Sequence, residues 1–259
     1  MKRLQTYLLL ALSLIFLGTL PSVAYTYDKG EQWSYPSSNP GRESFAGSGT
    51  ASSPYLIQCA QDLVNLAYIV TDNNDDVEGL YFKMTRDIYL NDFTVDANGN
   101  ITANGELKSW TPIGEYGTIW DDDFQGIFDG GGHTIYGLYL EEKGSRRFLG
   151  LFGSMEYATI KNLNIKNAYL YAEPTDNIVQ LGALVGNCTS STISNVSVEN
   201  CYTQIVKSVN ATSQHGGIIG VAYDEVTLNN CSFSGNIYNS NSDENQVYVG
   251  GLVGDLRNT

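Results

Sequence analysis

GLFG at residues 150–153 places two apolar residues between glycines, and versions of this phrase return three times further along the chain. The later copies are ALVG at 183–186, GIIG at 217–220 and GLVG at 251–254. The closing glycines lie 33, 34 and 34 residues apart. Such even spacing at this period is typical of proteins built from stacked repeats.

A second phrase follows each of the first three glycine phrases. It reads IKNLNI at 160–165, ISNVSV at 193–198 and LNNCSF at 228–233, with apolar residues at positions 1, 4 and 6. Side chains of a straight strand alternate between its faces, so position 1 cannot face the same side as positions 4 and 6. The residue before position 4 is always Asn, which tolerates the left-handed backbone of a tight corner. We therefore predict corners at Asn162, Asn195 and Asn230.

Together the two phrases predict an all-β fold, a right-handed parallel β-helix (β-solenoid) in which like residues stack in successive coils. The asparagines are expected to form an amide ladder, and the glycines to permit close backbone approach or positive φ. A β-sandwich gives no reason for a 34-residue period, and propeller blades run longer. The predicted interior ladders are Ile160/Ile193/Leu228, Leu163/Val196/Cys231 and Ile165/Val198/Phe233.

An earlier, shorter copy is predicted at IYGLYL, 135–140, with Gly137 in the asparagine position and GIFD at 126–129 as its glycine phrase. The distance from Ile135 to Ile160 indicates a minimum unit of 25 residues. Later copies are then expected to carry polar insertions, placed at 168–180, 201–214 and 236–249.

The chain before the repeats divides into three predicted segments. Residues 1–24 have a basic start, an apolar run and Ser22-Val23-Ala24, so a signal peptide cleaved after Ala24 is expected. Residues 25–46 are expected to be a flexible N-terminal segment. Residues 47–109 are expected to form an N-terminal cap and first coils, with a strand at 54–57 and an amphipathic helix. The apolar face of this helix is predicted to consist of Cys59, Leu63, Leu66, Ala67 and Val70. The solenoid repeats then occupy 110–259.

Charge and cysteine content narrow the class of protein. Removing the signal peptide takes two of 14 basic residues and none of 28 acidic ones, which leaves a net charge of −16. This argues against nucleic acid and anionic membranes as partners, and no membrane insertion is expected after cleavage. The four cysteines fit either disulfides, in three possible pairings, or small buried hydrophobic residues. They are Cys59, Cys188, Cys201 and Cys231.

The glycine phrases with their strand phrases resemble the GLUG-motif repeats of exported bacterial proteins. WTPIG at 110–114, FQGIFDGGGHTI at 124–135, and GSGT at 47–50 through PYLI at 54–57 look like the lead-in of such proteins, so the resemblance spans about 47–254. ALVG departs from the motif at its first residue. The resemblance implies a secreted or cell-surface β-helical module, in adhesin-like or peptidase-associated proteins, and implies no single chemistry.

Two clusters invite a comparison with β-helical polysaccharide hydrolases. Asp121-Asp122-Asp123 and Gln214-His215-Gly216-Gly217 resemble parts of a polygalacturonase site, which uses paired carboxylates. The Asn-Thr-Asp and Arg-x-Lys elements of those enzymes are absent from the sequence. His215 is therefore interpreted as a turn residue, and no catalytic residue is predicted.

Other candidates have simpler interpretations. Asp96–Asn100 has a calcium-like spacing but is better explained as a hairpin turn, and His133 lacks a nucleophile or metal partner. Arg146 and Arg147 lack the partners of a lyase site. No cofactor or metal is predicted. Several aromatic residues are candidates for sugar stacking or, more simply, strand residues: Tyr116, Tyr136, Tyr139, Tyr157, Tyr169, Tyr171, Trp110 and Trp120.

The sequence thus predicts an exported, non-catalytic β-solenoid that serves as an adhesin-like or binding scaffold for glycan or extracellular protein. The alternatives are a carbohydrate-active β-helix enzyme, either hydrolase or lyase, and a structural spacer of a larger surface protein. The chain stops at Thr259, before the next strand phrase is due. We therefore expect either a truncated piece with further C-terminal domains or a frayed last coil.

Overall fold

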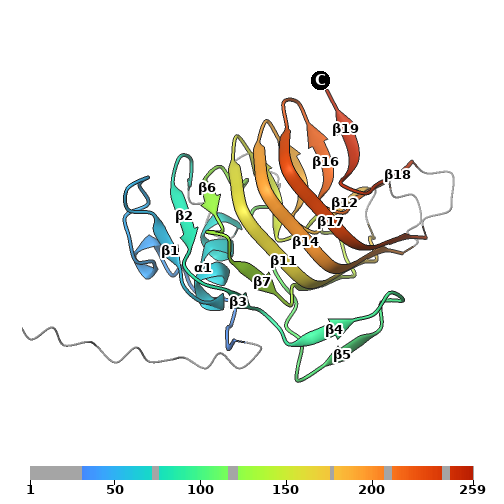
Figure 1. Cartoon of the computed structure of the whole chain (residues 1–259), viewed down its shortest axis with the longest axis horizontal. Helices are drawn as coiled ribbons and strands as arrows, with labels where there is room; N and C mark the ends of the chain where they lie inside the picture. Colours follow the sequence, from blue (N-terminus) through green and yellow to red (C-terminus); the bar gives the residue numbers. More distant parts are fainter. Residues whose placement is uncertain are drawn as a thin grey trace, which may run out of the picture.

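The computed structural model describes residues 31–71, 76–115, 122–175, 178–206, 212–240 and 246–258. These residues form the predicted parallel β-solenoid, whose coils stack in chain order from blue to red (Figure 1). The elements are η1 (Arg42–Ser44), β1 (Tyr55–Ile57), α1 (Ala60–Thr71), β2 (Tyr81–Met84), β3 (Ile88–Tyr89), β4 (Phe93–Val95), β5 (Ile101–Ala103), β6 (Ile127–Asp129), β7 (Thr134–Tyr136), β8 (Tyr139–Glu142), β9 (Phe148–Leu149), β10 (Phe152–Glu156), β11 (Thr159–Ala172), β12 (Ile178–Gly182), β13 (Val185–Thr189), β14 (Thr192–Ile205), β15 (Thr212–Gly216), β16 (Ile219–Tyr223), β17 (Thr227–Asn239), β18 (Val247–Gly250) and β19 (Val253–Arg257).

Each later coil contributes one strand to each of three sheets. The long sheet runs β1-β2-β6-β11-β14-β17, the second sheet runs β10-β13-β16-β19, and the third runs β9-β12-β15-β18. Among the described strands these pairs are parallel, and β4 with β5 forms an antiparallel hairpin. Parallel stacking keeps equivalent residues of successive coils at the same height, so one sequence pattern serves every coil.

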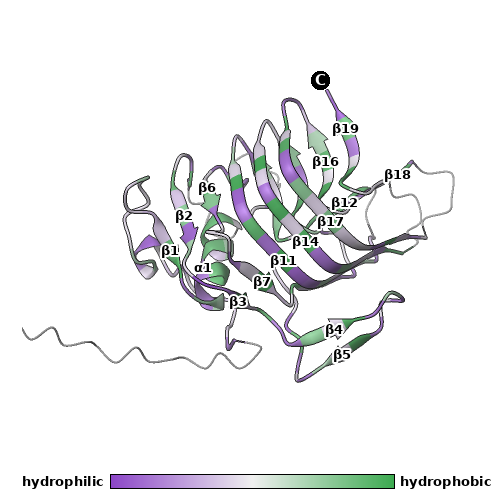
Figure 2. Cartoon of the chain, viewed as in Figure 1, coloured by the Kyte–Doolittle hydropathy of each residue, from purple (hydrophilic) through white to green (hydrophobic). Residues whose placement is uncertain are grey.

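The predicted interior ladders are confirmed. Ile160 pairs with Ile193 and then Leu228, and the ladders that begin at Leu163 and Ile165 follow the same order. All three of these first-rung side chains are fully buried. Figure 2 shows the resulting alternation of apolar and polar residues along β11 and β14. Removal of these side chains from water is the main force that holds the coils together.

The predicted asparagine corners are also confirmed. Asn162, Asn195 and Asn230 have φ values of 54°, 54° and 53°. Their side chains form the amide ladder: Asn195 Nδ2 donates to Asn162 Oδ1 at 3.0 Å, and Asn230 Nδ2 donates to Asn195 Oδ1 at 2.9 Å. The same residue therefore supplies both the turn and the bond between coils.

Each coil contains further left-handed corners that the phrases did not predict. Asn167 and Asn200 form a second column, at φ 55° and 50°, joined by an amide hydrogen bond of 2.6 Å. A third column follows the second sheet and consists of Tyr157, Ser190 and Asp224, at φ 48°, 45° and 56°.

The earlier copy is present, but its predicted register is wrong by five residues. Ile135 pairs with Ile165 rather than lying over Ile160, so Gly137 (φ 70°) belongs to the Asn167 corner. The GIFD segment is strand β6, which pairs with Thr159–Lys161, and not a glycine phrase. From Ile135 to Ile165 is 30 residues, so the predicted 25-residue unit was too short. The expected insertions are smaller too, because their first residues continue the long strands to Ala172, Ile205 and Asn239.

The glycine phrases lie where a strand of the third sheet ends and one of the second begins. Their closing glycines have no positive φ and serve close backbone approach. A Cβ added at Gly186 would lie 2.6 Å from Leu149 N and 2.8 Å from Gln180 O. Because the obstacles are backbone atoms, the corner accepts no side chain there.

The N-terminal cap consists of β1 and α1, as predicted. Helix α1 buries Leu63, Leu66 and Val70 of its predicted face, and also Val64 and Ile69, because the first coils enclose it. Residues 31–46, expected to be flexible, instead place two aromatic side chains, Trp33 and Phe45, in the core. The predicted signal peptide and cleavage site lie outside the described residues.

The final coil is well formed rather than frayed, since β19 pairs with β16 from Val253 to Arg257. No described residues stack on its far side, and side chains in interior columns are therefore exposed. Val249, which follows the fully buried His215 in its column, is 50% exposed, and Leu256, which follows Ala222, is 69% exposed.

All four cysteines are free thiols. Cys188 and Cys201 are buried within the coils, and Cys231 occupies the aliphatic ladder with Leu163 and Val196. The interpretation as small hydrophobic residues, rather than the disulfide alternative, therefore describes this structure.

Candidate functional site

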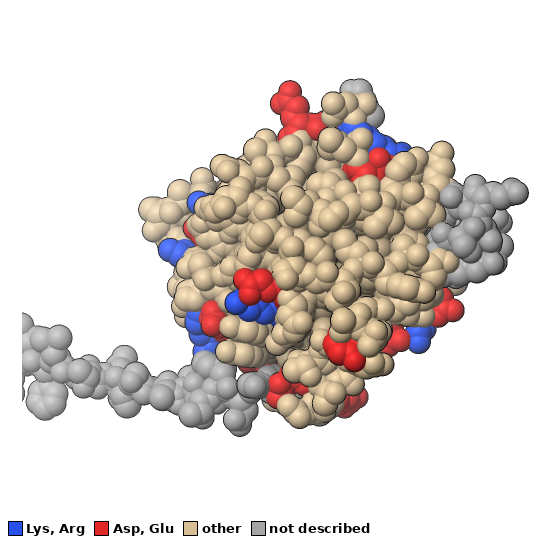
Figure 3. Space-filling model, turned by 45° about the vertical axis from the view of Figure 1, so that its right-hand side comes forward, with Lys and Arg blue, Asp and Glu red and all other residues tan. Residues whose placement is uncertain are grey.

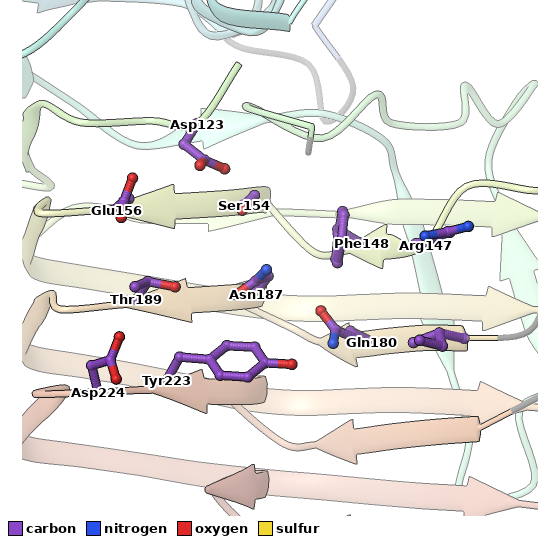
Figure 4. Close-up of a pocket in the computed structure, with 11 residues that line it drawn as sticks. Asp123, Arg147, Phe148, Ser154, Glu156, Gln180, Asn187, Thr189, Tyr223 and Asp224 are labelled. Atoms are coloured by element: carbon purple, nitrogen blue, oxygen red, sulfur yellow. The ribbon is translucent and has the colours of Figure 1, made fainter. Parts of the chain in front are cut away.

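A groove of about 400 Å³ lies on the outer side of the corner between the second and third sheets (Figure 4). Its volume is within the range of small-molecule sites. Strands β10, β13 and β16 form one wall, and β9 and β12 contribute to the other. The lining residues are Asp123, Arg147, Phe148, Ser154, Glu156, Ile178, Gln180, Asn187, Thr189, Tyr223 and Asp224.

Strand alternation determines which residues reach the groove. On β12, Val179 and Leu181 are fully buried in the core, so the intervening Gln180 faces outward. On β13, Cys188 is buried in the core while Asn187 and Thr189 line the groove. Because the coils are in register, Asn187 lies over Ser154 and Gln180 follows Phe148. The groove therefore crosses several coils.

A chain of side-chain hydrogen bonds runs from Gln180, at the groove, toward the last coil. Gln180 Nε2 donates to Gln214 Oε1 at 2.5 Å, and Gln214 Nε2 donates to Asp255 Oδ2 at 2.6 Å. Arg257 Nε donates to the same carboxylate oxygen at 2.6 Å. This hydrogen bond to Asp255 raises the pKa of the Arg257 guanidinium. Gln180 and Gln214 are almost completely buried, so the hydrogen bonds hold the Gln180 side chain fixed in the wall.

Two amide oxygens of the groove have no hydrogen-bond donor in the protein. They are Oε1 of Gln180 and Oδ1 of Asn187, both shielded from solvent at the atom. A buried acceptor without a donor costs about 1–3 kcal/mol, and native structures contain few of them. These oxygens are therefore positions where a bound molecule can gain a hydrogen bond.

The charged groups around the groove are mostly acidic. Asp123, Glu156 and Asp224 contribute carboxylates, and Arg147 contributes a guanidinium group. Figure 4 shows Asp123 and Glu156 near one end of the groove, with the Tyr223 ring extending across it toward the β12 side. No basic cluster appears on the face in Figure 3, where charged side chains are sparse.

The structure separates the two clusters that resembled a hydrolase site. Asp121 lies outside the described residues, and Asp123 lines the groove. The prediction that His215 is a turn residue was wrong. It lies in β15, and its side chain is fully buried in the solenoid interior. Its Nε2 is 2.8 Å from Thr203 Oγ1, and burial lowers its pKa from 6.5 to about 3. The histidine therefore faces away from the groove carboxylates and is neutral at pH 7.

The other candidate polar sites are occupied by local contacts. Asp96 accepts hydrogen bonds from the backbone N–H groups of Asn98 and Asn100, which makes the predicted hairpin turn between β4 and β5. His133 Nδ1 lies 3.5 Å from Asp87 Oδ1, and Arg146 pairs with Glu115. Within the described ranges, no group of three His, Cys, Asp or Glu side chains is placed to hold a metal ion.

Two of the aromatic candidates, Tyr139 and Tyr169, stack on each other. Tyr139, Tyr169 and Tyr202 form a stack with ring centroids 5.6 and 5.7 Å apart, and Phe93 of the β4–β5 hairpin packs against it. Trp110 is buried. Two more of these rings, Tyr116 and Trp120, lie outside the described residues. The rings that line the groove are Phe148 and Tyr223, and sequence reasoning selected neither of them.

Gln180 and Asn187 were also missed, although the sequence carries a signal for one of them. QLGALVG at 180–186 and QHGGIIG at 214–220 place Gln at the same position before two of the glycine phrases. A polar residue repeated on the outer face of a repeat indicates a functional or ladder position. Asn187 has no equivalent, since its column reads Ser154, Asn187, Val221 and Asp255.

Similarity to known proteins is confined to segments of much longer chains. The chain is 29% identical over 245 residues to a protein named halomucin from Haloquadratum walsbyi, which covers 83% of this chain and 2% of that protein. It is 32% identical over 154 residues to a protein of Evansella cellulosilytica named "Putative Gly-rich membrane protein", covering 59% of this chain and 15% of that protein. No family model and no solved structure matches the chain. In the part of the chain that the structure describes, no helix has the length and apolar character to cross a membrane.

Proposed function

We propose that this chain is a non-catalytic, exported surface module, related to the GLUG-motif proteins, whose groove binds glycan or extracellular protein. The observation that carries the proposal is the pair of buried groove acceptors, Gln180 Oε1 and Asn187 Oδ1, which lack a donor in the protein. Acceptors held in place by stacked strands favour recognition of a ligand.

Three further observations support this proposal. The similar proteins carry the names halomucin and Gly-rich membrane protein, and neither name describes an enzyme. The match covers only a small part of each of these proteins, which fits one module of a larger surface protein. An acidic chain with no basic cluster in Figure 3 is a poor partner for nucleic acid or anionic lipid.

The enzyme alternative keeps one specific observation in its favour. Three carboxylates, from Asp123, Glu156 and Asp224, line the same groove, and glycoside hydrolysis requires two. A hydrolase also needs one carboxyl group held protonated by its environment. Burial raises the pKa of one carboxyl group, Glu31, as such an acid would require. Glu31 does not line the groove, however, and instead accepts a hydrogen bond from the backbone N–H of Ala60.

The test combines binding and turnover with the purified full chain. An array of neutral, amino and acidic glycans and of matrix proteins measures binding, and a reducing-end assay on the bound polysaccharides measures cleavage. Binding without release of sugar is expected. Release of sugar that disappears in the Glu156→Gln variant would establish the enzyme alternative and contradict the proposal.

A further inference from the structure

The Asp255 carboxylate, at the far end of the hydrogen-bond chain, determines which groups of Gln214 and Gln180 donate and which accept. The Asp255 carboxylate, which accepts from Arg257, can also only accept from Gln214, so Gln214 must present its NH₂ group there. Its own oxygen then faces back and accepts from the NH₂ group of Gln180. The amide orientation of Gln180, which is otherwise a matter of choice, therefore follows from a carboxylate two coils away.

This assignment leaves the Gln180 oxygen directed at the groove. The side chain lines the groove and is 4% exposed, and its Oε1 has no donor in the protein. Asn187 Oδ1, on the facing strand β13, is a second acceptor of the same kind. Both oxygens are shielded from solvent, so a ligand that reaches them adds hydrogen bonds that water does not make in the free protein.

The remaining polar groups of the groove also favour a ligand rich in donors. Carboxylates accept only, and the groove has three of them against a single guanidinium group. A phosphate, sulfate or uronate group would meet these carboxylates and the two amide oxygens with unfavourable charge. The ligand is therefore neutral or positively charged, with several hydroxyl or amine groups.

The apolar surfaces of the groove narrow the class of ligand further. The Tyr223 ring spans the groove, and Ile178, which is 37% exposed, lies on the opposite wall. A pyranose ring combines hydroxyl groups at its edge with C–H groups on its face, and aromatic rings pack well against such faces. An extended peptide would depend on backbone pairing, but β12 and β13 are already paired on both sides.

We infer that the groove binds a glycan built from neutral or amino sugars, with sugar hydroxyl or amine groups donating to Gln180 Oε1 and Asn187 Oδ1. This inference rests on the proposed function and specifies the ligand class and the recognition residues. Asn187 and Gln180 set the specificity for donors, and the acidic side chains exclude anionic glycans.

The experiment is calorimetric titration of the full chain with tetramers of defined chemistry. The probes are cellotetraose, mannotetraose, chitotetraose, the glucosamine tetramer and tetragalacturonate. Binding of at least one neutral or amino tetramer is expected, with no binding of tetragalacturonate. Binding of tetragalacturonate alone, or of no tetramer, would overturn the inference.

A matched pair of variants tests the site. Asn187→Leu removes one buried acceptor at similar volume, and Asn229→Leu makes the same change on the outer side of the long sheet, beside Ser194. Loss of one hydrogen bond predicts a roughly twofold to tenfold weaker affinity for Asn187→Leu, and unchanged affinity for Asn229→Leu. Thermal melting confirms that both variants fold, and Tyr223→Ala provides a second, independent change in the groove.

The outcomes separate this inference from the proposed function. Glycan binding that neither Asn187→Leu nor Tyr223→Ala weakens would place the ligand elsewhere and overturn the site, while a binding module would remain. Binding to a matrix protein but to no glycan would overturn the ligand class only. Cleavage of a bound tetramer would contradict the non-catalytic function and leave the recognition residues standing.

Discussion

Replacing Asn195, the central asparagine of the amide ladder, is expected to destabilise the solenoid through two separable effects. Asn195 has φ 54°, donates to Asn162 and accepts from Asn230. A left-handed residue other than Gly, Asn or Asp costs about 1–2 kcal/mol. Each lost hydrogen bond costs about 0.5–1.5 kcal/mol, and we take the lower end because both bonds are exposed. Asn195→Ala should therefore lower the free energy of unfolding by about 2–3 kcal/mol.

Asn195→Gly separates the two contributions. Glycine adopts the left-handed backbone without strain, so only the ladder bonds and the added freedom of the unfolded chain count against it. The expected loss is about 1–2 kcal/mol. Ser194→Ala is the matched control, since Ser194 is adjacent, lies in the same strand and has no positive φ.

Urea unfolding monitored by circular dichroism measures these differences, provided that the slope with denaturant is the same in all variants. An Ala variant that is as stable as the Gly variant would refute the argument that the corner requires a left-handed residue. Two asparagine variants that are both as stable as Ser194→Ala would refute the contribution of the ladder as well.

Three further predictions concern the packing of the coils. Gly186→Ala should destabilise the protein by about 1–3 kcal/mol, because the added Cβ meets backbone atoms at 2.6–2.9 Å; urea unfolding at wild-type stability would contradict this. His215 has its pKa lowered from 6.5 to about 3, so the stability that its neutral form contributes is present above pH 6.5 and declines as the pH falls toward 3, by at most about 1.4 kcal/mol per unit. The contribution of the histidine is isolated by comparing acid unfolding of the wild type and of His215→Leu, which carries the residue found at this position in the preceding coil. Identical pH profiles for the two proteins would exclude a contribution from His215. Cys188 and Cys201 should react with a thiol reagent only after unfolding, since burial raises the pKa of Cys188 to about 12 and also raises that of Cys201. Mass spectrometry without reductant should then count four labels on the unfolded chain, and a smaller number would indicate a disulfide.

The sequence alone determined the repeat and its register wherever a residue type is tied to a backbone conformation. Asn162, Asn195 and Asn230 identified a corner because few residues adopt positive φ. Their apolar neighbours then determined the interior ladders, since a side chain that repeats in a solenoid can only stack on itself. The Tyr157, Ser190 and Asp224 corner was not predictable, because those residue types are not specific to left-handed turns.

The same backbone rule led to the wrong register for the early copy at 135–140. Strands β11 and β14 each have two corners five residues apart, at Asn162 and Asn167 in β11, and either corner could hold Gly or Asn. Gly137 could therefore be assigned to either, and only the pairing of Ile135 with Ile165 showed which was correct. A local pattern could not settle it, because the choice depends on which strands form hydrogen bonds across coils.

The groove depended on tertiary structure almost entirely. Gln180 and Asn187 are seven residues apart in sequence and belong to strands of different sheets, which the close approach at Gly186 brings together. Whether the Gln180 oxygen faces the groove depends on Asp255, a residue of another coil. The sequence thus determined the scaffold, because its rules are local and repeated, whereas the structure decided the site, because its residues come from several coils and most of them do not repeat.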